Sequence, residues 1–557
     1  MHIVMIAAEN GALLGGKVGG IGDVIRDVPL ALAQAGHRCT VITPGYSSLA
    51  RLNPAIPVGT VTTRFCGRTE VLELLAVEPR PESSTGSAGT DDKGAGRGSR
   101  AGRKTSGTAK KSLVSHYVLE HPLFAAGGAG AIYCDDQQGP FATDAHKFAL
   151  FCAAACEVLS GGGLGPIDVI HLHDWHAALV AILARIPAHQ SLRNVPLVYS
   201  IHNLSLQGIR PLSGHESSFH HWFPDLVPDL RLVQDPRYWD CINLMRVGIN
   251  LSDKVHAVSP SYAREILVPT DLTHGFIGGE GLEGDLQRVS AQGRLVGILN
   301  GCDYSQPALA ASSHAQLLEL MERSLLSWVG ERHMIPAAHF HAQRRIGQWR
   351  TRASLGRVLT SVGRITAQKS RLFTETVTAA VSAGVESSPG AAPQRCSALE
   401  QLLDSLNEDV FIMVGNGEAE LEAFFTDVMA RRDNFLFLCG FSEALAAAIY
   451  ASGDLFLMPS TFEPCGISQM LAMRAGMPCV VHHVGGLRDT VSHGENGFAF
   501  SGDTAREQAE NMLAAVQEAR ALMEDKPAWE RICQGARDSR FSWTKAVDEY
   551  LSQLYRH

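Results

Sequence analysis

Short apolar runs separated by amphipathic stretches of helix length make up most of the hydrophobic pattern of this chain. Residues 2–9 (HIVMIAAE) predict a buried strand, residues 23–36 a helix, and residues 39–44 (CTVITP) the next strand. A strand, a helix and a second strand in this order favour a parallel sheet covered by helices. The same order returns at residues 167–173 and 196–203, which flank another helical stretch.

The second half of the chain repeats this alternation more regularly. Five apolar runs alternate there with helical stretches, so the sequence predicts an α/β fold with two doubly wound, Rossmann-like domains. In such sheets the default ligand site is the crevice outside the carboxyl ends of the strands. The five runs are residues 359–365, 409–417, 434–440, 454–460 and 478–483.

Three segments interrupt the alternation. Residues 81–112 are rich in Gly, Ser, Thr and Lys with almost no apolar side chains, which predicts a disordered insertion. Residues 386–397 (ESSPGAAPQRCS) predict a shorter flexible loop. Residues 306–350, rich in His and Arg, predict a partly helical linker. The predicted boundaries are 1–305 for the first domain, 306–350 for the linker, 351–535 for the second domain and 536–557 for a C-terminal helix.

Composition limits the possible functions. At 557 residues, 45% of them hydrophobic, the chain is too long for one ordinary core. Its net charge of −9 argues against a protein that coats nucleic acid or acidic membrane, although it is compatible with a small phosphorylated ligand. No apolar run reaches membrane-spanning length, and the N-terminal MHIVMIAAE is too short for a signal peptide.

Cysteine usage indicates the cellular compartment. The twelve cysteines are scattered along the chain and form no CxxC pair. Cys152 and Cys156, four residues apart, predict one buried face of a helix. We therefore expect reduced thiols in a cytoplasmic protein.

The Gly-rich stretch before Val18 (GALLGGK) fits the opening of a nucleotide-triphosphate loop, but Val18 stands where a Ser or Thr would hold Mg²⁺. The glycines also miss the register of a dinucleotide fingerprint. What remains is Lys17 beside Gly19 and Gly20, a combination that suits an anion because glycines let backbone N–H groups approach it. A helix beginning near Asp23 adds partial positive charge. A plain Gly-rich surface loop is the alternative.

Polar residues also follow two apolar runs of the first half. HLHDWH, which contains Asp174, invites a metal interpretation, but the binuclear pattern H-x-H-x-D-H needs one residue between the second His and the Asp. A polar strand end that faces a crevice is therefore favoured. In SIHNLSLQG, His202 is either a structural residue or a hydrogen-bond donor to a sugar hydroxyl or a leaving oxygen.

Charged residues follow two apolar runs of the second half. Arg364 and Lys369 in GRITAQKS lie five apart across a strand-to-helix turn, a pattern that suits a diphosphate but also fits ordinary surface charge. In STFEPCGISQ, Glu463 ends a strand, and the amides of Gly466 and Ile467 can face an anion. A carboxylate there suits sugar chemistry, and a helix-capping acid is the alternative.

Together these stretches resemble the bacterial glycogen synthase and plant starch synthase family. These are retaining glycosyltransferases of the GT-B type, in which two Rossmann-like domains face an interdomain crevice. Ten motifs occur in family order over nearly the whole chain, and the Lys17 loop looks like the family's Lys-x-Gly-Gly motif. The motifs are KVGGIGDV, HLHDWHAALVA, YSIHNLSLQG, VHAVSPSYAREI, GILNGCD, SVGRITAQKS, GFSEALAAAIYASGDLFLMPSTFEPCGISQ, GGLRDTV, ENGFAF and FSWTKAVDEYL.

The resemblance implies roles for residues of the first half. Lys17 looks like the lysine near the donor diphosphate, with Gly19 and Gly20 in the same motif. Asp23 and Asp174 match acids that line the glucose or acceptor side. Two further matches are His202, near the transferred sugar, and Asn300, the Asn of the G-I-L-N-G motif.

In the second half, Arg364 and Lys369 match the diphosphate clamp of the family. Glu463 matches the acid of its E-P-C-G motif, followed by the amides of Gly466 and Ile467. A further position, Phe441, stands where bacterial members often have a Tyr that stacks on adenine; Phe keeps the ring face and loses the hydroxyl.

The chain departs from the family in three places. YSQPALA follows GILNGCD where W-N-P is usual, and HFHAQRRIGQWRTRASLG replaces a lysine-rich segment. Leu471 and Ala475 stand where aromatic residues are common.

The C-terminal helix FSWTKAVDEYLSQLY is expected to cross back to the first domain.

The resemblance implies transfer of glucose from ADP-glucose to the non-reducing end of an α-1,4-glucan, without a cofactor or a metal ion. Both domains are expected to close over the donor. Three alternatives stay open. They are a GT-B enzyme that uses UDP-glucose or makes a short maltosyl product, a non-catalytic glucan-binding scaffold, and a metallohydrolase built on HLHDWH.

Overall fold

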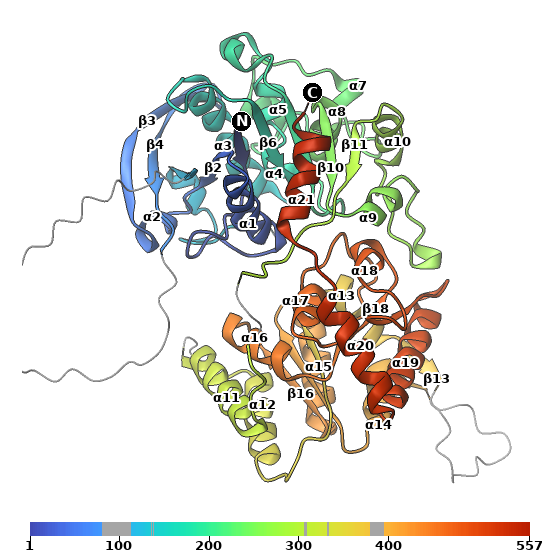
Figure 1. The fold of residues 1–557 in the computed structure, drawn as a ribbon. Coiled ribbons are helices and arrows are strands. Elements are labelled where there is room, and N and C mark those ends of the chain that lie inside the picture. The colour runs from blue at the N-terminus through green and yellow to red at the C-terminus, as the bar shows by residue number, and fades with distance from the viewer. Residues whose placement is uncertain are drawn as a thin grey trace, which may run out of the picture. The chain divides into compact units, whose positions relative to one another are not determined.

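The computed structural model describes residues 1–80, 113–134, 136, 139–305, 309–330, 334–378 and 395–556 (Figure 1). The predicted insertion at residues 81–112 lies outside the described residues. Of the expected loop at 386–397, Arg395–Ser397 is described, and it forms strand β14 rather than a flexible segment. β14 pairs antiparallel with β13 (Thr376–Thr378), so the last three residues of the expected loop belong to a two-stranded sheet.

The chain divides into two compact units. The first comprises Met1–Leu197, Gly208–Asp235 and Asp240–Leu251, and the second Val198–Gln207, Pro236–Trp239 and Ser252–His557. Each has its own buried apolar core. The domain boundaries drawn from the sequence at residues 305, 350 and 535 stay predictions.

Parallel strands form the centre of the first unit. All five residues of β1 are buried, β1 pairs in parallel with β2 and β6, and β2 pairs in parallel with β5. Strands that are apolar on both faces are typical of parallel sheets covered on both sides. The order β6-β1-β2-β5-β4-β3 means that the chain fills one side of β1 first and then returns to the other side. The strands are β1 (His2–Ile6), β2 (Arg38–Pro44), β3 (Ala55–Phe65), β4 (Arg68–Val77), β5 (Val114–Glu120) and β6 (Val169–His173).

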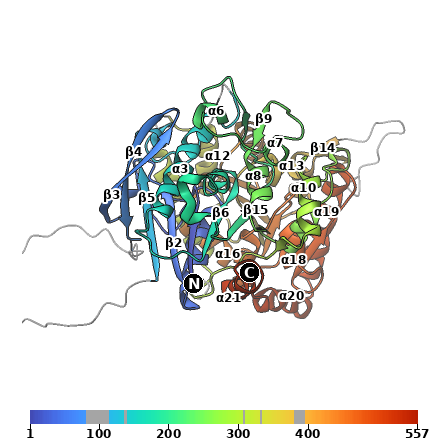
Figure 2. The same cartoon turned by 90° about the horizontal axis from the view of Figure 1, so that it is seen from above.

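The hairpin of β3 and β4 was not anticipated from the sequence. The two strands pair antiparallel, and β4 pairs antiparallel with β5. Cys66 and Gly67 form the two-residue loop, with φ of 52° and 73°. Positive φ at both loop residues gives the turn whose twist matches a β-hairpin. Figures 1 and 2 both show β3 and β4 side by side at the edge of this unit.

Helices and short strands complete the first unit. In α3, the predicted buried face is confirmed, because Cys152 and Cys156 are both fully buried. All twelve cysteines of the chain are free thiols, as the sequence predicted. The elements are α1 (Gly20–Gln34), α2 (Leu49–Leu52), η1 (Pro122–Ala125), α3 (Ala142–Ser160), α4 (Asp174–Ala177), α5 (Val180–Leu183), η2 (Pro187–Leu192), β8 (Ile209–Pro211), α6 (Phe219–Trp222), α7 (Leu230–Val233), β9 (Cys241–Asn243) and α8 (Leu244–Leu251).

A six-stranded parallel sheet forms the centre of the second unit; the sequence predicted five of its strands and missed β19. Its order is β16-β15-β12-β17-β18-β19, which is the 3-2-1-4-5-6 order of a Rossmann sheet. The strand succession therefore switches sides between β12 and β17. Three more parallel strands of this unit follow the order β11-β10-β7. The strands are β12 (Val358–Val362), β15 (Val410–Gly415), β16 (Phe435–Cys439), β17 (Leu455–Met458), β18 (Cys479–His482), β19 (Gly497–Phe500), β7 (Leu197–Ile201), β10 (Lys254–Ala257) and β11 (Leu295–Gly297).

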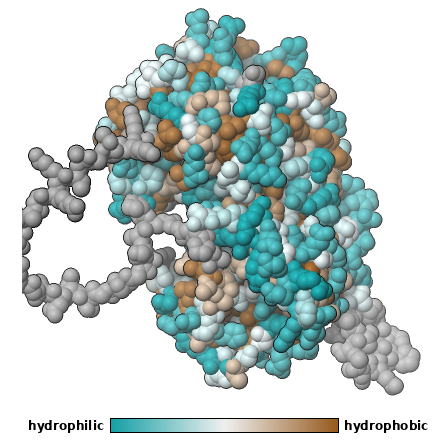
Figure 3. Space-filling model, in the orientation of Figure 1, coloured by the Kyte–Doolittle hydropathy of each residue, from teal (hydrophilic) through white to brown (hydrophobic). Residues whose placement is uncertain are grey.

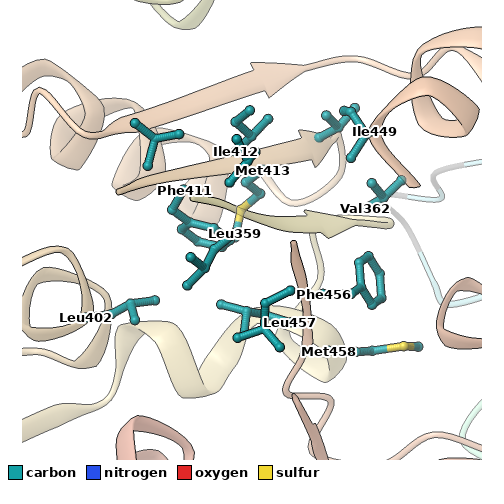
Figure 4. Close-up of a cluster of buried hydrophobic side chains, with 14 of the residues drawn as sticks. Leu359, Val362, Leu402, Phe411, Ile412, Met413, Ile449, Phe456, Leu457 and Met458 are labelled. Atoms are coloured by element: carbon teal, nitrogen blue, oxygen red, sulfur yellow. The ribbon is translucent and has the colours of Figure 1, made fainter. Parts of the chain in front are cut away.

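The core of the second unit lies around the strands of this sheet. Figure 4 shows Leu359, Phe411 and Leu457 from three of the strands pointing into one cluster. Helices α11 and α12, from the segment expected to be a linker, contribute Leu317 and Trp349 to the same core. The helices are α9 (Pro260–Glu265), η3 (Leu272–His274), α10 (Glu283–Ala291), α11 (His314–Gly330), α12 (Ala337–Trp349), α13 (Ala367–Thr374), α14 (Ala398–Ser405), α15 (Ala419–Arg431), α16 (Glu443–Ser452), α17 (Ser468–Arg474), α18 (Gly485–Thr490), α19 (Ala505–Leu522), α20 (Lys526–Asp538), α21 (Trp543–Glu549) and η4 (Tyr550–Leu554).

On the face shown in Figure 3, hydrophilic and hydrophobic side chains are interspersed. Within the described ranges, no helix is both long enough and apolar enough to cross a bilayer.

Candidate active site

The Gly-rich loop of the first unit joins β1 to α1, next to the strand that ends at Asp174. Lys17 Nζ donates to Asp23 Oδ1 at 2.7 Å, and Arg26 lies 3.1 Å from the same oxygen. Helix α1 begins at Gly20 rather than at Asp23, because Gly19 already has the extended backbone of an N-cap. Asp23 therefore lies in the first turn, where the helix dipole favours an acid.

The amides of this loop bind a carboxylate of the protein itself. Glu9 Oε2 accepts hydrogen bonds from the backbone N–H groups of Val18 at 2.8 Å, Gly19 at 2.7 Å and Gly22 at 3.3 Å. The hydroxyl of Tyr133 donates to Glu9 Oε1 at 2.8 Å. Glu9 is 2% exposed, so this anion is buried under the loop that the sequence predicted to cradle an external one.

Asp174 follows β6 and opens α4 with an unusual backbone. Its φ is 54°, in the left-handed region, and its side chain is buried. The rings of His171 and His173 before it stack at 4.3 Å. In the part of the chain that the structure describes, no group of three or more His, Cys, Asp and Glu side chains is arranged to hold a metal ion.

His202 follows β7 in the second unit and is half-buried. Burial, with a smaller contribution from His256, lowers the pKa of His202 to about 3. The ring is therefore neutral at neutral pH and can donate one N–H. His256 on β10 is held by Ser200, whose Oγ lies 2.8 Å from His256 Nδ1.

Asn300 follows β11 and is 4% exposed. Its side-chain Oδ1 is buried without a hydrogen-bond partner among the described residues. The backbone N–H of Asn300 faces the thiol of Cys465, whose pKa is raised mainly by burial. Asn300 therefore lies next to the E-P-C-G turn, which contains Glu463 and Cys465.

The E-P-C-G acid forms an ion pair with the lysine of the G-R-I-T-A-Q-K-S turn. Lys369 Nζ donates to Glu463 Oε2 at 2.6 Å, and Ser460 Oγ donates to the same oxygen at 3.0 Å. Lys369 follows β12 and Glu463 follows β17, the two strands at the switch point of the sheet. Arg364, in the same turn as Lys369, is exposed and has no partner among the described residues.

The turn after Glu463 is shaped by glycines. Gly466 has φ of 75°, and helix α17 begins at Ser468 with Ile467 as its N-cap. Gly485 has φ of 44°, and a Cβ there would lie 1.9 Å from the carbonyl oxygen of Glu463. A Cβ on Gly486 would lie 2.1 Å from the carbonyl oxygen of Cys465. Only glycines let α18 pack this closely on the turn.

Phe441 follows β16 with 52% of its surface exposed. The indole Nε1–H of Trp328, near the end of α11, donates to the carbonyl oxygen of Phe441 at 3.2 Å. A Cβ on Gly440 would lie 2.5 Å from the Trp328 ring, so the ring packs directly on this backbone. Trp328 thus holds the turn that carries Phe441.

The structure therefore brings the predicted residues together in sets within each unit. Lys17, Gly19, Gly20 and Asp23 share one loop of the first unit, and Asp174 ends the neighbouring strand. In the second unit, Lys369 contacts Glu463 directly and Asn300 lies against Cys465. The sequence reasoning missed Glu9, Tyr133, Ser460 and Trp328. Of these, only Glu9, the polar residue that ends an apolar strand, left a signal in the sequence.

Two Rossmann-type strand orders, with polar groups after the strands at each switch point, fit the architecture of GT-B glycosyltransferases, and the comparisons with known proteins assign the chain to that class. A family model for the starch synthase catalytic domain matches residues 2–288, and one for glycosyl transferases group 1 matches residues 394–518. The chain belongs to the starch synthase catalytic domain family, and its curated relatives are glycogen synthases.

The relatives cover the chain to different extents. A glycogen synthase of Deinococcus radiodurans is 34% identical over 74% of this chain and 78% of its own length. A glycogen synthase of Streptococcus sanguinis is 32% identical over 100% of this chain and 99% of its own length. The catalytic domain of starch synthase IV from Arabidopsis thaliana, solved with ADP and acarbose, shares the fold with a TM-score of 0.70, 24% identity, and coverage of 100% of this chain and 98% of that one. The chain is thus a glycosyltransferase of the glycogen synthase type, a family that acts on a nucleotide sugar and a glucan.

Proposed function

We propose that the donor is ADP-glucose and that its glucose is transferred, with retention of configuration, to the non-reducing end of an α-1,4-glucan. The observation that carries this proposal is the cluster of Arg364, Lys369 and Glu463 after β12 and β17. It combines cations for a diphosphate with a carboxylate for a sugar, at the switch point where Rossmann sheets bind nucleotides.

Arg364 and Lys369 hold the two phosphates in this proposal. Among the described residues Arg364 has no partner to give up, and Lys369 can exchange Glu463 for a phosphate oxygen. The N–H groups of Gly466 and Ile467 precede α17 and supply further donors to the diphosphate. These cations and dipoles stand in for a metal ion, so we expect transfer without one.

The sugar side of the proposed site is formed by neutral and acidic groups. Glu463 holds hydroxyls of the glucose and stabilises the positive charge that develops at its C1. His202, neutral because its pKa is about 3, donates a hydrogen bond near the transferred sugar, and Asn300 offers its partnerless Oδ1. We assign Asp23 and Asp174 to the glucose or acceptor side, and Lys17 to the diphosphate.

In the proposed reaction, the bond between C1 of the glucose and the phosphate oxygen breaks while a bond to the acceptor O4 forms on the same face. The proton of the acceptor 4-hydroxyl passes to the leaving phosphate, and ADP is released. Exclusion of water from the donor prevents its hydrolysis. Phe441 offers its exposed ring to the adenine.

We also propose a cytoplasmic location, supported by the twelve free thiols and the net charge of −9. The test of the function is a donor screen: purified protein is offered ADP-, UDP- and GDP-glucose, each with glycogen and with maltose, with and without a chelator. We expect label from ADP-glucose in the polymer in both conditions. Preferred use of UDP-glucose, or release of a short soluble product, would overturn the donor or the acceptor assignment respectively.

A further inference from the structure

The carboxylate of Glu9 has a bonding pattern that the reaction itself does not explain. Its two oxygens accept four hydrogen bonds, three from loop amides and one from Tyr133. A carboxylate that is saturated in this way and 2% exposed has little capacity left for a ligand. Its partners instead span the loop that carries Lys17.

We propose that Glu9 is the positioning residue of this loop: its buried carboxylate gathers the amides of Val18, Gly19 and Gly22, and the gathered loop presents Lys17 and Asp23 to the substrates. The inference rests on the roles proposed above for Lys17 and Asp23.

The glycines of the loop fit this arrangement. A Cβ on Gly19 would lie 3.3 Å from Glu9 Oε1, and one on Gly22 would lie 3.1 Å from Glu9 Oε2. The same Cβ on Gly22 would also lie 2.8 Å from Lys17 Cγ. The loop therefore wraps closely around the carboxylate, and the stem of Lys17 and the Glu9 carboxylate both lie where a Gly22 side chain would project. This close packing couples the Glu9 carboxylate to the position of the lysine.

A second buried network holds Tyr133 in place. The ammonium of Lys147, fully buried, donates to the carbonyl of Ile132 at 2.6 Å and pairs with Asp144 at 2.8 Å. Asp144 also accepts the backbone N–H of Cys134 at 3.1 Å. Both neighbours of Tyr133 are thus anchored. Burial, reinforced by the charge of Glu9, raises the pKa of Tyr133 well above its ordinary value, so the hydroxyl stays a donor.

The test compares two buried tyrosines on the full-length enzyme. Tyr133→Phe removes the hydrogen bond to Glu9, whereas the matched control Tyr46→Phe removes a 2.7 Å hydrogen bond to the carbonyl of Ala8 and none of the hydrogen bonds to Glu9. Hydrogen exchange of a peptide covering residues 17–23 is measured together with kcat and KM for ADP-glucose. We expect faster exchange and a lower kcat for Tyr133→Phe only. Equal behaviour of the two variants would overturn the proposal.

Two Glu9 variants grade the effect. Glu9→Gln keeps one oxygen for the three amides and can accommodate Tyr133 by rotation of its hydroxyl, so it should rescue part of what Glu9→Ala loses. A misplaced lysine can cost on the order of 10²-fold in turnover, which is the scale expected for Glu9→Ala. If Glu9→Ala does not fold, the exchange rates and kcat values of the unaltered protein, Glu9→Gln and Tyr133→Phe still test the proposal. Normal exchange in Glu9→Gln and Tyr133→Phe, together with normal turnover, would refute a positioning role.

A double-mutant cycle separates positioning from general stability. In a Lys17→Ala background, Tyr133→Phe should lower kcat by a much smaller factor than it does in the unaltered protein, because only its effect through Asp23 remains. An equal fold-reduction in kcat in both backgrounds would show that Tyr133 does not act through Lys17 and would overturn the proposal. Failure of the proposed donor looks different: the unaltered protein would not use ADP-glucose, and the cycle and exchange would then be run with the nucleotide sugar that it accepts.

Discussion

Two buried carboxylates follow strands at the switch points of the two units, and the protein holds them in opposite ways. Glu9, after β1, is 2% exposed and accepts three backbone amides and one phenol. Glu463, after β17, is 7% exposed and accepts from the side chains of Lys369 and Ser460. Backbone donors cannot leave Glu9 unless the loop changes shape, whereas a lysine can move to an arriving phosphate. We therefore expect Glu9 to act as a structural acid in one unit and Glu463 to be available for chemistry in the other, although the two are similarly buried.

The strongest test of this contrast is Glu463→Ala. If Glu463 stabilises the transition state, its removal should lower kcat by roughly 10²–10³, the scale of one preorganised electrostatic group. ADP affinity should change far less, because the cations that bind the diphosphate remain. Steady-state kinetics and calorimetry measure the two effects separately. Near-normal turnover in a folded Glu463→Ala protein would remove the distinction between the two acids.

Arg364 and Lys369 should both contribute to ADP binding but should differ in how much they stabilise the fold. Each charge-assisted contact to the diphosphate contributes about 1.5–3 kcal/mol, so both Arg364→Ala and Lys369→Ala should weaken ADP binding roughly 10- to 150-fold. Only Lys369→Ala leaves the Glu463 carboxylate buried without its cation, so only this variant should also lower the melting temperature. Calorimetry and thermal unfolding provide both values. A lower melting temperature for Arg364→Ala would show that its exposed guanidinium has a structural role.

Acid should weaken the fold through histidines that are buried in the neutral form. Burial lowers the pKa of His202 to about 3 and the pKa values of His256 and His482 to about 4. Unfolded histidines titrate near 6.5, so below that pH the unfolded chain takes up protons that the folded chain does not, and stability falls as the pH falls. Each histidine contributes at most about 1.4 kcal/mol per pH unit in the window from about 6.5 down to 4. Melting temperatures at pH 7 and pH 5 test this, and equal values would contradict it.

The smallest effect is expected at Trp328, where one side chain holds a loop by one hydrogen bond. Trp328→Phe removes the bond to the Phe441 carbonyl, and a neutral hydrogen bond contributes about 0.5–1.5 kcal/mol. We expect KM for the nucleotide sugar to rise a few-fold, with kcat nearly unchanged. Trp349→Phe is the matched control, because it loses a 2.9 Å bond to the carbonyl of Asp433 elsewhere in the unit. The same rise in KM for both variants would argue against a role of Trp328 at the base.

Much of the fold could be predicted because the strands are buried on both faces. Runs such as residues 409–417 and 454–460 became β15 and β17, each a few residues shorter than the apolar run. Short or polar strands escaped notice. The β3–β4 hairpin has one exposed face and depends on the positive φ of Cys66 and Gly67, which an apolar-run criterion does not detect.

The site could be predicted only in part for a related reason. A motif places residues in sequence, and parallel strand order then explains why Lys369 reaches Glu463. The side chain that accepts a hydrogen bond from a backbone amide cannot be identified from a sequence motif in this way. The Gly-rich loop was predicted to bind an external anion, because its own residues do not show that its backbone amides already donate to Glu9. The contact of Trp328 with Phe441 joins residues more than a hundred positions apart, outside any motif.

The close packing of Gly485 and Gly486 on the E-P-C-G turn has a use in sorting genomic sequences. Any side chain at either position would place a carbon about 2 Å from a carbonyl oxygen of Glu463 or Cys465, so the turn would have to move. If a diverged homologue keeps the acid but has lost this Gly-Gly pair, the turn that carries the acid must have a different backbone position. We therefore expect the two motifs, taken together, to separate intact from decayed copies better than the acid alone.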